Sequence, residues 1–422
     1  MNHHSMVSFY SAAFSRKKCI LDFELEVVSQ MDLHLLCKHQ AAHGATVSNI
    51  LSHRLKMIRW SHCDATIGVS VNTKLNNRQR HILSLLTKNY DSLGRSDIAE
   101  VLSESHEVSR ATVIRDLQAL IDQGMVEVIG SGPATRYRAT SITRILRPID
   151  ADAYFAIPQD DRYLIGTDNK TFFDELAKTP LLTESEIKLI DRLNDDYLMR
   201  VKARDGALYR RELQRFTVEL AWKSSQIEGN TYSLLETEEL LRTQQRASGR
   251  SELETQMVLN HKSALDRIMS TPDAYSPLDI ADILDIHEIL TRDLDITAGI
   301  RTQPVGIIGT NYLPSSDVST LTAELERAVA ITNTKEHPVE AALVISGLIA
   351  YLQPFVDGNK RTARLVANAI LLSSDYAALS YRSVDEVAYK KSVLLIDEQQ
   401  SFLSYKEMFV DQFAFATKNY FL

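Results

Sequence analysis

The stretch "LQPFVDGNKRTAR", residues 352–364, joins two apolar helical patterns through a short segment that contains proline and glycine. Pro354 ends the first helix, because the residue before a proline is pushed out of the helical region. Gly358 permits the positive φ of a tight turn, and the second helix begins near Asn359. The pattern therefore predicts two helices joined by a tight turn.

The second helix carries the cations Lys360, Arg361 and Arg364 at its start. A helix N-terminus presents unpaired N–H groups and a partial positive charge, which favour anions and disfavour cations. Three cations there make sense if a polyanion sits in front of them, and Asp357 is placed to hold Mg²⁺ shared with the same phosphates. The alternative, a capped helix with a solvated basic first turn, leaves this combination of residues unexplained.

The turn resembles the signature of the Fic/Doc family, His-Pro-Phe-x-Asp/Glu-Gly-Asn-Gly/Lys-Arg-x-x-Arg. Members typically transfer AMP from ATP to a hydroxyl group of a target protein. The resemblance covers roughly residues 150–422. It implies a helical domain that uses ATP and Mg²⁺, with Phe355 as a core anchor and Asp357 as the metal ligand. It assigns ATP binding to five residues, the last two of them on the β- and γ-phosphates: Gly358, Asn359, Lys360, Arg361 and Arg364.

A β-prone segment with glycines and prolines, "GIRTQPVGIIGTNYLPSS" (299–316), is similar to the flap hairpin of the same family. In such proteins the flap aligns the target segment beside the active site. The resemblance therefore implies a β-hairpin with five target-aligning residues: Val305, Gly306, Ile307, Ile308 and Gly309.

The segment "SSQIEG" (224–229) resembles the family's inhibitory motif, Ser/Thr-x-x-x-Glu-Gly/Asn. Ser224, Glu228 and Gly229 fill its defined positions. The resemblance implies that Glu228 pairs with Arg364 and blocks productive placement of ATP. A carboxylate does compete with a phosphate for one guanidinium fork. The alternative for Glu228 taken alone is a helix-end cap.

The turn departs from the family's pattern at two positions. Gln353 stands where the family has the histidine that acts as general base, and a neutral amide can position a hydroxyl but cannot take its proton. Losing general-base assistance typically costs about 10²–10⁴-fold in rate, whereas ATP binding uses other residues. Lys360 stands where AMP-transferring members commonly have glycine, and the phosphate-transferring Doc-type relatives carry lysine there.

Three functions follow from these residues. The first is a Fic-type adenylyltransferase that modifies a Ser, Thr or Tyr hydroxyl of a target protein, inhibited by Glu228 and weakened by Gln353. The second is a non-catalytic ATP-sensing regulator that binds DNA. The third is a Doc-like phosphotransferase, although Doc-like proteins are short single domains without the inhibitory motif.

Residues 75–145 read as three amphipathic helices and a hairpin, which resembles a winged helix-turn-helix domain. Ser109 is the expected N-cap of the third helix, and Gly124 ends it. In such a domain the third helix enters the major groove of DNA. The candidate DNA contacts lie on this helix and on the wing: Arg110, Thr112, Arg115, Arg136 and Arg138. A solvated basic face, or a module that contacts proteins, is the competing interpretation.

The rest of the chain divides by pattern into an extension at 1–74, a linker with a helical arm at 146–206, and a Fic domain at 207–422 with its inhibitory helix at 207–230. The expected fold is mainly α, with one hairpin flap and a small α+β winged domain. The net charge of −8 gives no bulk attraction to nucleic acid. The chain has three cysteines and no apolar run long enough to span a bilayer, which favours the cytoplasm. A homodimer stays open, because two-fold dimers are common.

Overall fold

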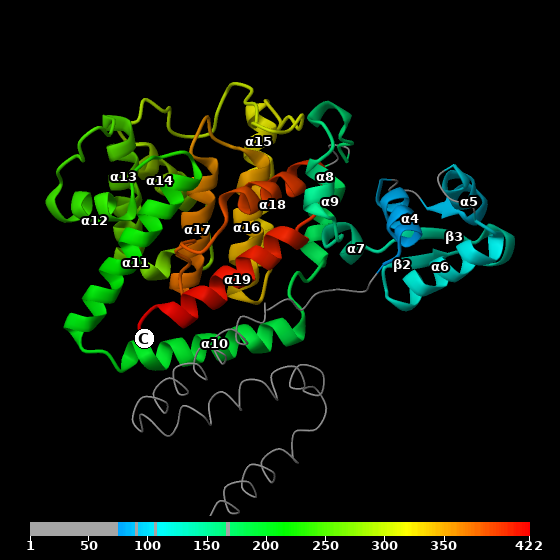
Figure 1. Ribbon diagram of the computed structural model, residues 1–422, viewed down its shortest axis with the longest axis horizontal. Helices are drawn as coiled ribbons and strands as arrows, with labels where there is room; N and C mark the ends of the chain where they lie inside the picture. Colours follow the sequence, from blue (N-terminus) through cyan, green and yellow to red (C-terminus); the bar gives the residue numbers. More distant parts are fainter. Residues whose placement is uncertain (1–74, 89–91, 105–107, 166–168) are drawn as a thin grey trace, which may run out of the picture. The chain divides into compact units, whose positions relative to one another are not determined.

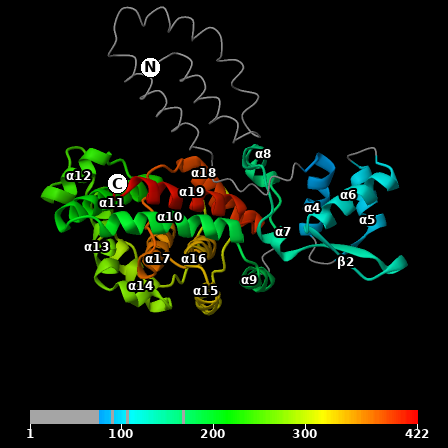
Figure 2. The same ribbon diagram turned by 90° about the horizontal axis from the view of Figure 1, so that it is seen from below.

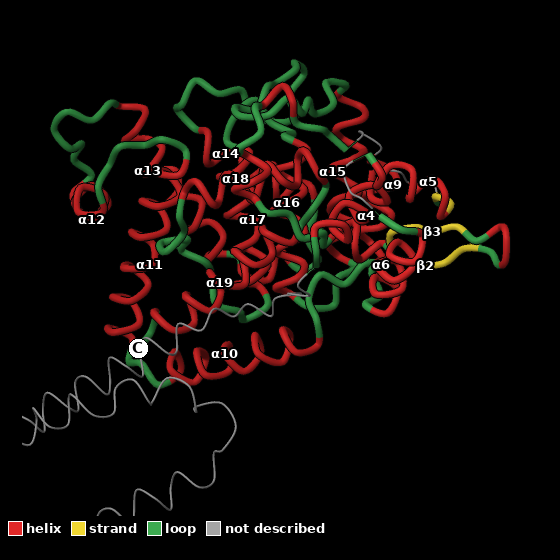
Figure 3. The backbone as a smooth tube through the Cα atoms, turned by 45° about the vertical axis from the view of Figure 1, so that its right-hand side comes forward, coloured by secondary structure: helices red, strands yellow, loops and turns green. Residues whose placement is uncertain are grey.

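The computed structural model describes residues 75–88, 92–104, 108–165 and 169–422. The predicted extension at 1–74, which holds the three cysteines, lies outside these residues. Within the described ranges the chain is mainly helical, and the strands lie near its N-terminal end (Figure 3). The predicted class, mainly α with a small α+β region, is confirmed.

The small N-terminal region contains the predicted helices and hairpin. Its elements are α4 (Asn77–Lys88), β1 (Leu93–Gly94), α5 (Arg95–Ser103), α6 (Arg110–Asp122), β2 (Val126–Ile129) and β3 (Arg136–Ala139). The strands form an antiparallel sheet in the order β1-β3-β2. The Ser109 side chain caps α6 by accepting from the Thr112 N–H, and Gly124 follows with a φ of 69°. The strand β1, two residues long, is too short for any sequence period to reveal.

The arm that follows is more helical than the sequence indicates. Residues 146–173 show no sustained helical period, yet they contain α8 (Ala151–Phe155), and α9 (Asn169–Lys178) begins before that range ends. A single turn such as α8 is shorter than any window that reveals periodicity. The helix α10 (Glu184–Lys202) starts with a capping box, in which the side chains of Thr183 and Glu186 each bind the other's backbone N–H.

The remaining helices form one body. In chain order they are α7 (Ser141–Ile145), which precedes the arm, α11 (Gly206–Ile227), α12 (Leu234–Thr243), α13 (Glu252–Ser270), α14 (Ile280–Thr291), α15 (Val318–Asn333), α16 (Pro338–Leu352), α17 (Asn359–Ser373), α18 (Glu386–Gln399) and α19 (Leu403–Asn419). Among the described residues, no helix is both long and apolar enough to cross a membrane.

The centre of this body is α16, which packs against both α15 and α17 (Figure 1 and Figure 2). All of its residues from Val339 to Leu352 are buried, as expected of a helix that is apolar on every side. Gly347 lets the Phe402 ring approach closely, since a Cβ at this glycine would lie 2.4 Å from the ring. The two helices predicted around the turn are thus the core pair of the domain.

The predicted flap hairpin at 299–316 differs from expectation. All of these residues are described, and they form a loop with a turn at Ile308 and Gly309 but no paired strands. Arg301 takes the place of a ladder, because its side chain donates to the carbonyls of Gln303 (2.7 Å) and Ser315 (2.5 Å). Prolines at two positions of the segment also remove backbone donors that a ladder would use.

Candidate functional site

The candidate site is built on the turn between α16 and α17. Gln353 caps α16 in the left-handed region, with φ 47° and ψ 57°, and its N–H donates to the Ile349 carbonyl at 3.1 Å. Gly358 has φ 82° and precedes the first residue of α17. Both ends of the turn therefore lie where the proline and glycine predict them.

The side chain of Asn359 closes the turn instead of reaching out of it. Its Oδ1 accepts from the Phe355 N–H and its Nδ2 donates to the Phe355 carbonyl, both at 2.9 Å. The buried Phe355 ring stacks on His287, with ring centroids 3.7 Å apart. Nε2 of His287 donates to the Asp357 carbonyl at 3.0 Å. The prediction that Asn359 binds phosphate is thus restricted to its backbone N–H, at the helix N-terminus.

The Asp357 carboxylate lies at the exposed side of the turn, with a side chain that is 63% exposed. Oδ1 accepts from the Gly358 N–H (2.6 Å) and Oδ2 from Nη2 of Arg361 (3.0 Å). Mg²⁺ usually takes one or two carboxylates together with substrate phosphates and waters. A single exposed carboxylate beside a phosphate site fits this ion. The described residues contain no cluster of three or more His, Cys, Asp or Glu side chains that could hold a metal alone.

Arg361 has two buried donors that the turn itself does not use. The residue is 2% exposed, and its Nε and Nη1 have no hydrogen-bond partner among the residues that the structure describes. Unpaired buried donors are rare because they cost free energy, and more so on a charged group. A phosphate in front of the turn would supply acceptors for both.

Arg364, by contrast, has acceptors in several directions. This fully buried residue donates from Nη2 to the Glu228 carboxylate (2.9 Å) and from Nη1 to the Tyr389 hydroxyl (3.0 Å). It also donates to Ser224 from Nε and Nη2. The contact predicted between Glu228 and Arg364 is therefore present. Glu228 is also the C-cap residue of α11. The alternative interpretation, a helix-end cap, therefore describes the position of its backbone, whereas its side chain pairs with Arg364.

The electrostatic surroundings keep Glu228 ionised. Burial alone would raise the pKa of its carboxyl, but Arg364, Lys360 and Arg361 outweigh burial and lower that pKa below its usual value. A charged carboxylate at this place faces the same cations that a phosphate would need. Glu228 therefore acts as an internal anion of the site.

Ser224 is fixed from behind by His261 of α13. Nδ1 of His261 donates to the Met257 carbonyl (2.8 Å), because that oxygen can only accept. Its Nε2 is then the acceptor for the Ser224 hydroxyl proton (2.8 Å), which leaves a serine lone pair for Nε of Arg364. Burial lowers the pKa of His261 to about 3, so the ring stays neutral in this arrangement.

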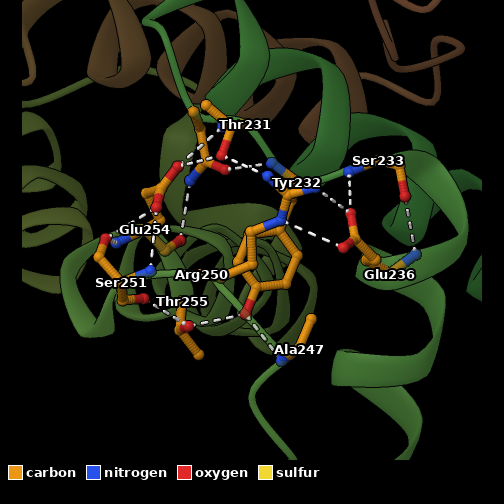
Figure 4. Close-up of polar contacts among 10 residues, drawn as sticks. Thr231, Tyr232, Ser233, Glu236, Ala247, Arg250, Ser251, Glu254 and Thr255 are labelled. Atoms are coloured by element: carbon orange, nitrogen blue, oxygen red, sulfur yellow. Dashed lines mark hydrogen bonds and ion pairs between the residues drawn. The ribbon is translucent and has the colours of Figure 1, made fainter.

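The chain that follows Glu228 is anchored to the start of α13 (Figure 4). Asn230 donates from Nδ2 to the Glu254 carbonyl (2.8 Å). The Thr231 N–H donates to Oε1 of Glu254 (3.0 Å). Arg250 adds a bond to the Thr231 hydroxyl (2.7 Å). Hydrogen bonds from Thr231 and from the α13 N-cap lower the pKa of Glu254 to about 2. Glu228 is thus held between a helix and a fixed loop.

The inhibitory residue, the flap and the turn, each predicted separately, line one cavity of about 210 Å³. It is lined by Glu228, residues 305–308 of the flap, Gln353 and residues 356–360 of the turn. Small-molecule sites usually have about 300–1,000 Å³, so the cavity with Glu228 in place is small for a nucleotide. The predicted flap residue Gly309 is absent from this lining, and its carbonyl accepts from Arg162 instead.

Gln353 presents one end of its side chain to this cavity. Its Nε2 donates to the Ala350 carbonyl at 2.5 Å, so the amide oxygen is the group of this side chain that remains to accept a hydrogen bond. An amide oxygen can accept a hydrogen bond from a hydroxyl but does not titrate near neutral pH. The position of the family's base is therefore occupied by an acceptor without basicity.

Four further residues contact the site without having been predicted from the sequence: His261, His287, Arg301 and Tyr389. None of them lies near the turn in sequence, and a buried histidine or tyrosine in a helix pattern carries no signal that separates it from the core. Arg301 had a visible cue, because it is the cation of the flap segment, and its Nε donates to the Gln353 carbonyl (2.7 Å).

In the small N-terminal region, the five predicted DNA contacts fall into two groups. Arg110 and Arg115 are exposed on α6, with Thr112 partly exposed beside them. Arg136 donates from Nε to the Ser92 carbonyl (2.9 Å), and Arg138 donates from Nε to Glu127 (2.9 Å). The wing arginines are thus engaged within the protein. A cavity of about 550 Å³ beside the wing is lined by Arg110 and by Arg95, which the sequence analysis did not single out.

Comparison with known proteins finds a family match for the part of the chain that contains the turn. The Fic/DOC family matches residues 277–371. The chain is 28% identical over 235 residues to the protein adenylyltransferase Fic of Nematostella vectensis, which covers 53% of each protein. It is 29% identical over 195 residues to the protein of the same name from Culex quinquefasciatus, covering 45% of this chain and 39% of that protein. The chain thus spans about half, or less, of the length of these relatives.

Among solved structures, Fic-1 (aa134–508) from C. elegans superimposes with a TM-score of 0.50 at 18% identity. The superposition covers 81% of this chain and 95% of that chain. At this identity the likeness concerns the fold alone. It agrees with the helical arrangement around α16 and α17.

Proposed function

Residues 277–371 are a Fic/DOC family domain, and from this premise we propose that the chain is an ATP-binding protein adenylyltransferase that Glu228 inhibits and Gln353 slows. In the proposed reaction a target Ser, Thr or Tyr hydroxyl attacks the α-phosphate of ATP. A P–O bond forms between the hydroxyl oxygen and the α-phosphorus, the bond from the α-phosphorus to the oxygen bridging to the β-phosphate breaks, and pyrophosphate leaves. The hydroxyl proton passes to solvent water.

The observation that carries this proposal is the pair of arginines at the start of α17. Arg361 is buried with two unpaired donors, and Arg364 is occupied by the carboxylate of Glu228 at 2.9 Å. One arginine lacks an anion and the other holds an internal one. A triphosphate that replaced Glu228 would satisfy both.

Each residue of the site has a role in the proposed reaction. Asn359 offers its backbone N–H to the phosphates, and Gly358 does the same once its N–H leaves Oδ1 of Asp357, to which it donates at 2.6 Å. Lys360 and the arginines offset the charge of the phosphates. Asp357 would hold Mg²⁺, which supplies charge neutralisation on the phosphates when bound. Gln353 orients the hydroxyl without removing its proton, which should make turnover slow.

The test uses ATP labelled at the α- or the γ-phosphate, with purified full chain, Glu228→Gly, and Glu228→Gly/Gln353→His, each with a mixture of candidate protein acceptors. Protein label from the α position in Glu228→Gly, increased when histidine is added, supports the proposal. Label that arises only when histidine is present supports an ATP-sensing regulator without turnover. Failure of every variant to bind ATP at millimolar concentration would overturn all of these functions.

Lys360 supports one alternative, a Doc-like transfer of the γ-phosphate. Its side chain lines the cavity and would crowd an α-phosphate more than glycine does. Label from the γ position and none from the α position identifies this reaction in the same experiment.

Arg110 and Arg115 support a second activity, DNA binding by the N-terminal region as a winged helix. Both are exposed on α6, the helix that would enter the major groove. The expected measurement is binding of a fluorescent DNA duplex whose affinity falls steeply with salt. Arg110→Ala/Arg115→Ala should weaken it, whereas Arg138→Ala, which removes an arginine already paired with Glu127, should have less effect.

The proposal includes a cytoplasmic location, where ATP is abundant and where a chain with three cysteines needs no disulfide. A homodimer stays a prediction, and light scattering of the purified chain measures it.

A further inference from the structure

We propose that residues 159–162 of the arm form a strap that holds the flap over the cavity, with Arg162 as its positioning residue. The proposal rests on the proposed function for its purpose, because the flap would align the acceptor there. The contacts themselves do not depend on that function.

On the flap side, the strap holds the turn by several polar bonds. Nη2 of Arg162 donates to the Gly309 carbonyl. Nε2 of Gln159 donates to Oδ1 of Asn311 (2.7 Å), and Nδ2 of Asn311 donates to Oδ1 of Asp160 (3.0 Å). Two side chains of the strap therefore hold Asn311, and the buried guanidinium of Arg162 holds Gly309.

On its other side, the strap is fastened to the end of α18. Nη1 of Arg162 lies 3.4 Å from Oε1 of Glu398, and their side chains are only 5% and 1% exposed. Glu398 also accepts at Oε2 from the Tyr154 hydroxyl (2.6 Å) and at its carbonyl from the Ile165 N–H (2.9 Å). The strap thus has a rigid base, since a buried ion pair with added hydrogen bonds is costly to open.

The flap needs such an anchor because it lacks a strand ladder of its own. Its near end is held by Arg301, which forks to the carbonyls of Gln303 and Ser315. The cavity-lining residues 305–308 come next, and Ile308 is 98% exposed. The strap then holds the chain again at Gly309. The residues that line the cavity are therefore suspended between Arg301 and Arg162.

The experiment measures amide hydrogen exchange of the full chain without nucleotide, so it is independent of ATP binding and turnover. In Arg162→Gln, the peptide covering residues 303–313 should exchange about tenfold faster or more, which is the scale of one lost hydrogen bond to a charged group. Gln159→Ala, at an exposed position, should give a smaller increase. The matched control is Asp152→Ala, which removes another contact of the arm with α18, the ion pair with Lys391, and should leave the flap unchanged.

A conservative variant separates positioning from stability. Arg162→Lys keeps a cation beside Glu398 but cannot also reach the Gly309 carbonyl. Its melting temperature should therefore return toward wild type while flap exchange stays fast. The strap is overturned if flap exchange follows the melting temperature across all variants, or if it stays at the wild-type rate in Arg162→Gln and Gln159→Ala. If Arg162→Gln does not fold, Gln159→Ala and Asn311→Ala decide the question.

Discussion

Arg364 is bonded to Ser224 twice, from Nε to the serine hydroxyl at 2.9 Å and from Nη2 to the serine carbonyl at 2.8 Å. Glu228 is therefore one of several acceptors for this guanidinium. Removing its carboxylate leaves the arginine fixed to α11 and to Tyr389. The contact with Glu228, which we propose to be inhibitory, can therefore be deleted while the guanidinium stays in place.

Glu228→Ala should destabilise the free protein and strengthen ATP binding together. Removing one partner of a buried ion pair costs about 3 kcal/mol of unfolding free energy. ATP at a hundredfold excess over its Kd should restore about 2.7 kcal/mol. Urea unfolding with and without ATP measures both effects.

Glu239→Ala is the matched control for this variant. Its carboxylate also pairs with an arginine, Arg242, but the pair is exposed. Exposed pairs contribute about 0–1 kcal/mol, so this variant should change neither stability nor ATP binding. A Glu228→Ala protein with unchanged ATP affinity would contradict the inhibitory role.

The two arginines of α17 should respond differently to replacement by methionine. Arg361→Met removes donors that have no partner and one bond to the exposed Asp357, so stability should change by less than about 1 kcal/mol. ATP binding should nevertheless be lost. Arg364→Met leaves Glu228 unpaired and should destabilise the fold by about 3 kcal/mol. Thermal unfolding and ATP titration of both variants check this contrast, and an Arg361→Met protein that still binds ATP normally would refute it.

Gln353→His in a Glu228→Gly background should raise the rate of transfer from ATP. A general base typically contributes about 10²–10⁴-fold, and ATP affinity should stay within a few-fold because the phosphate contacts are unchanged. The measurement is the initial rate of protein labelling with α-labelled ATP. The single variant Gln353→His, with Glu228 intact, should remain slow. Equal rates with glutamine and histidine would show that position 353 does not take the proton.

Stability should fall as pH is lowered from neutral. Burial lowers the pKa of His287 to about 4 and that of His261 to about 3. The unfolded chain takes up protons at these histidines below about pH 6.5 while the folded chain does not. Their contribution is therefore fully present above pH 6.5 and is lost as pH falls, toward pH 4 for His287 and toward pH 3 for His261. The loss is about 1.4 kcal/mol per pH unit for each histidine.

Comparison of wild type with His287→Gln isolates this effect. Urea unfolding at pH 7 and pH 5 should show about 2 kcal/mol less loss in the variant. The difference between the proteins is the measurement because other groups titrate too. Burial raises the pKa of Asp397, for instance, so its protonation acts in the opposite direction. Parallel pH profiles of the two proteins would contradict the assignment.

The sequence predicts this site well where local chemistry determines the backbone. Pro354 and Gly358 leave few conformations open to the turn, and the contact between Glu228 and Arg364 follows from a motif. The role of the Asn359 side chain could not be predicted in this way. An asparagine after a glycine at the start of a helix can bind an anion or can bind the backbone of the turn, and the sequence pattern is the same in both cases. In this protein the side chain binds the backbone N–H and carbonyl of Phe355.

The parts that sequence could not predict depend on contacts between distant segments. The flap is rich in β-prone residues, yet its backbone is held by Arg301 and Arg162, and the arginine at 162 belongs to an arm with no clear pattern. His287 reaches the Asp357 carbonyl from α14, 70 residues earlier in the chain. Secondary-structure propensity depends on residues that are close in sequence, whereas these contacts depend on how the helices pack against one another.

The left-handed backbone at Gln353, with its φ of 47°, affects which substitutions this position can accept. Such a conformation is costly for any residue with a side chain, and the surrounding hydrogen bonds already impose it. Histidine and glutamine codons differ only in the third base. One point mutation would therefore deliver an imidazole into a backbone already shaped to receive it, with no compensating change elsewhere. In a protein whose Glu228 no longer pairs with Arg364, we therefore expect this one-base change to be enough to raise the rate of transfer.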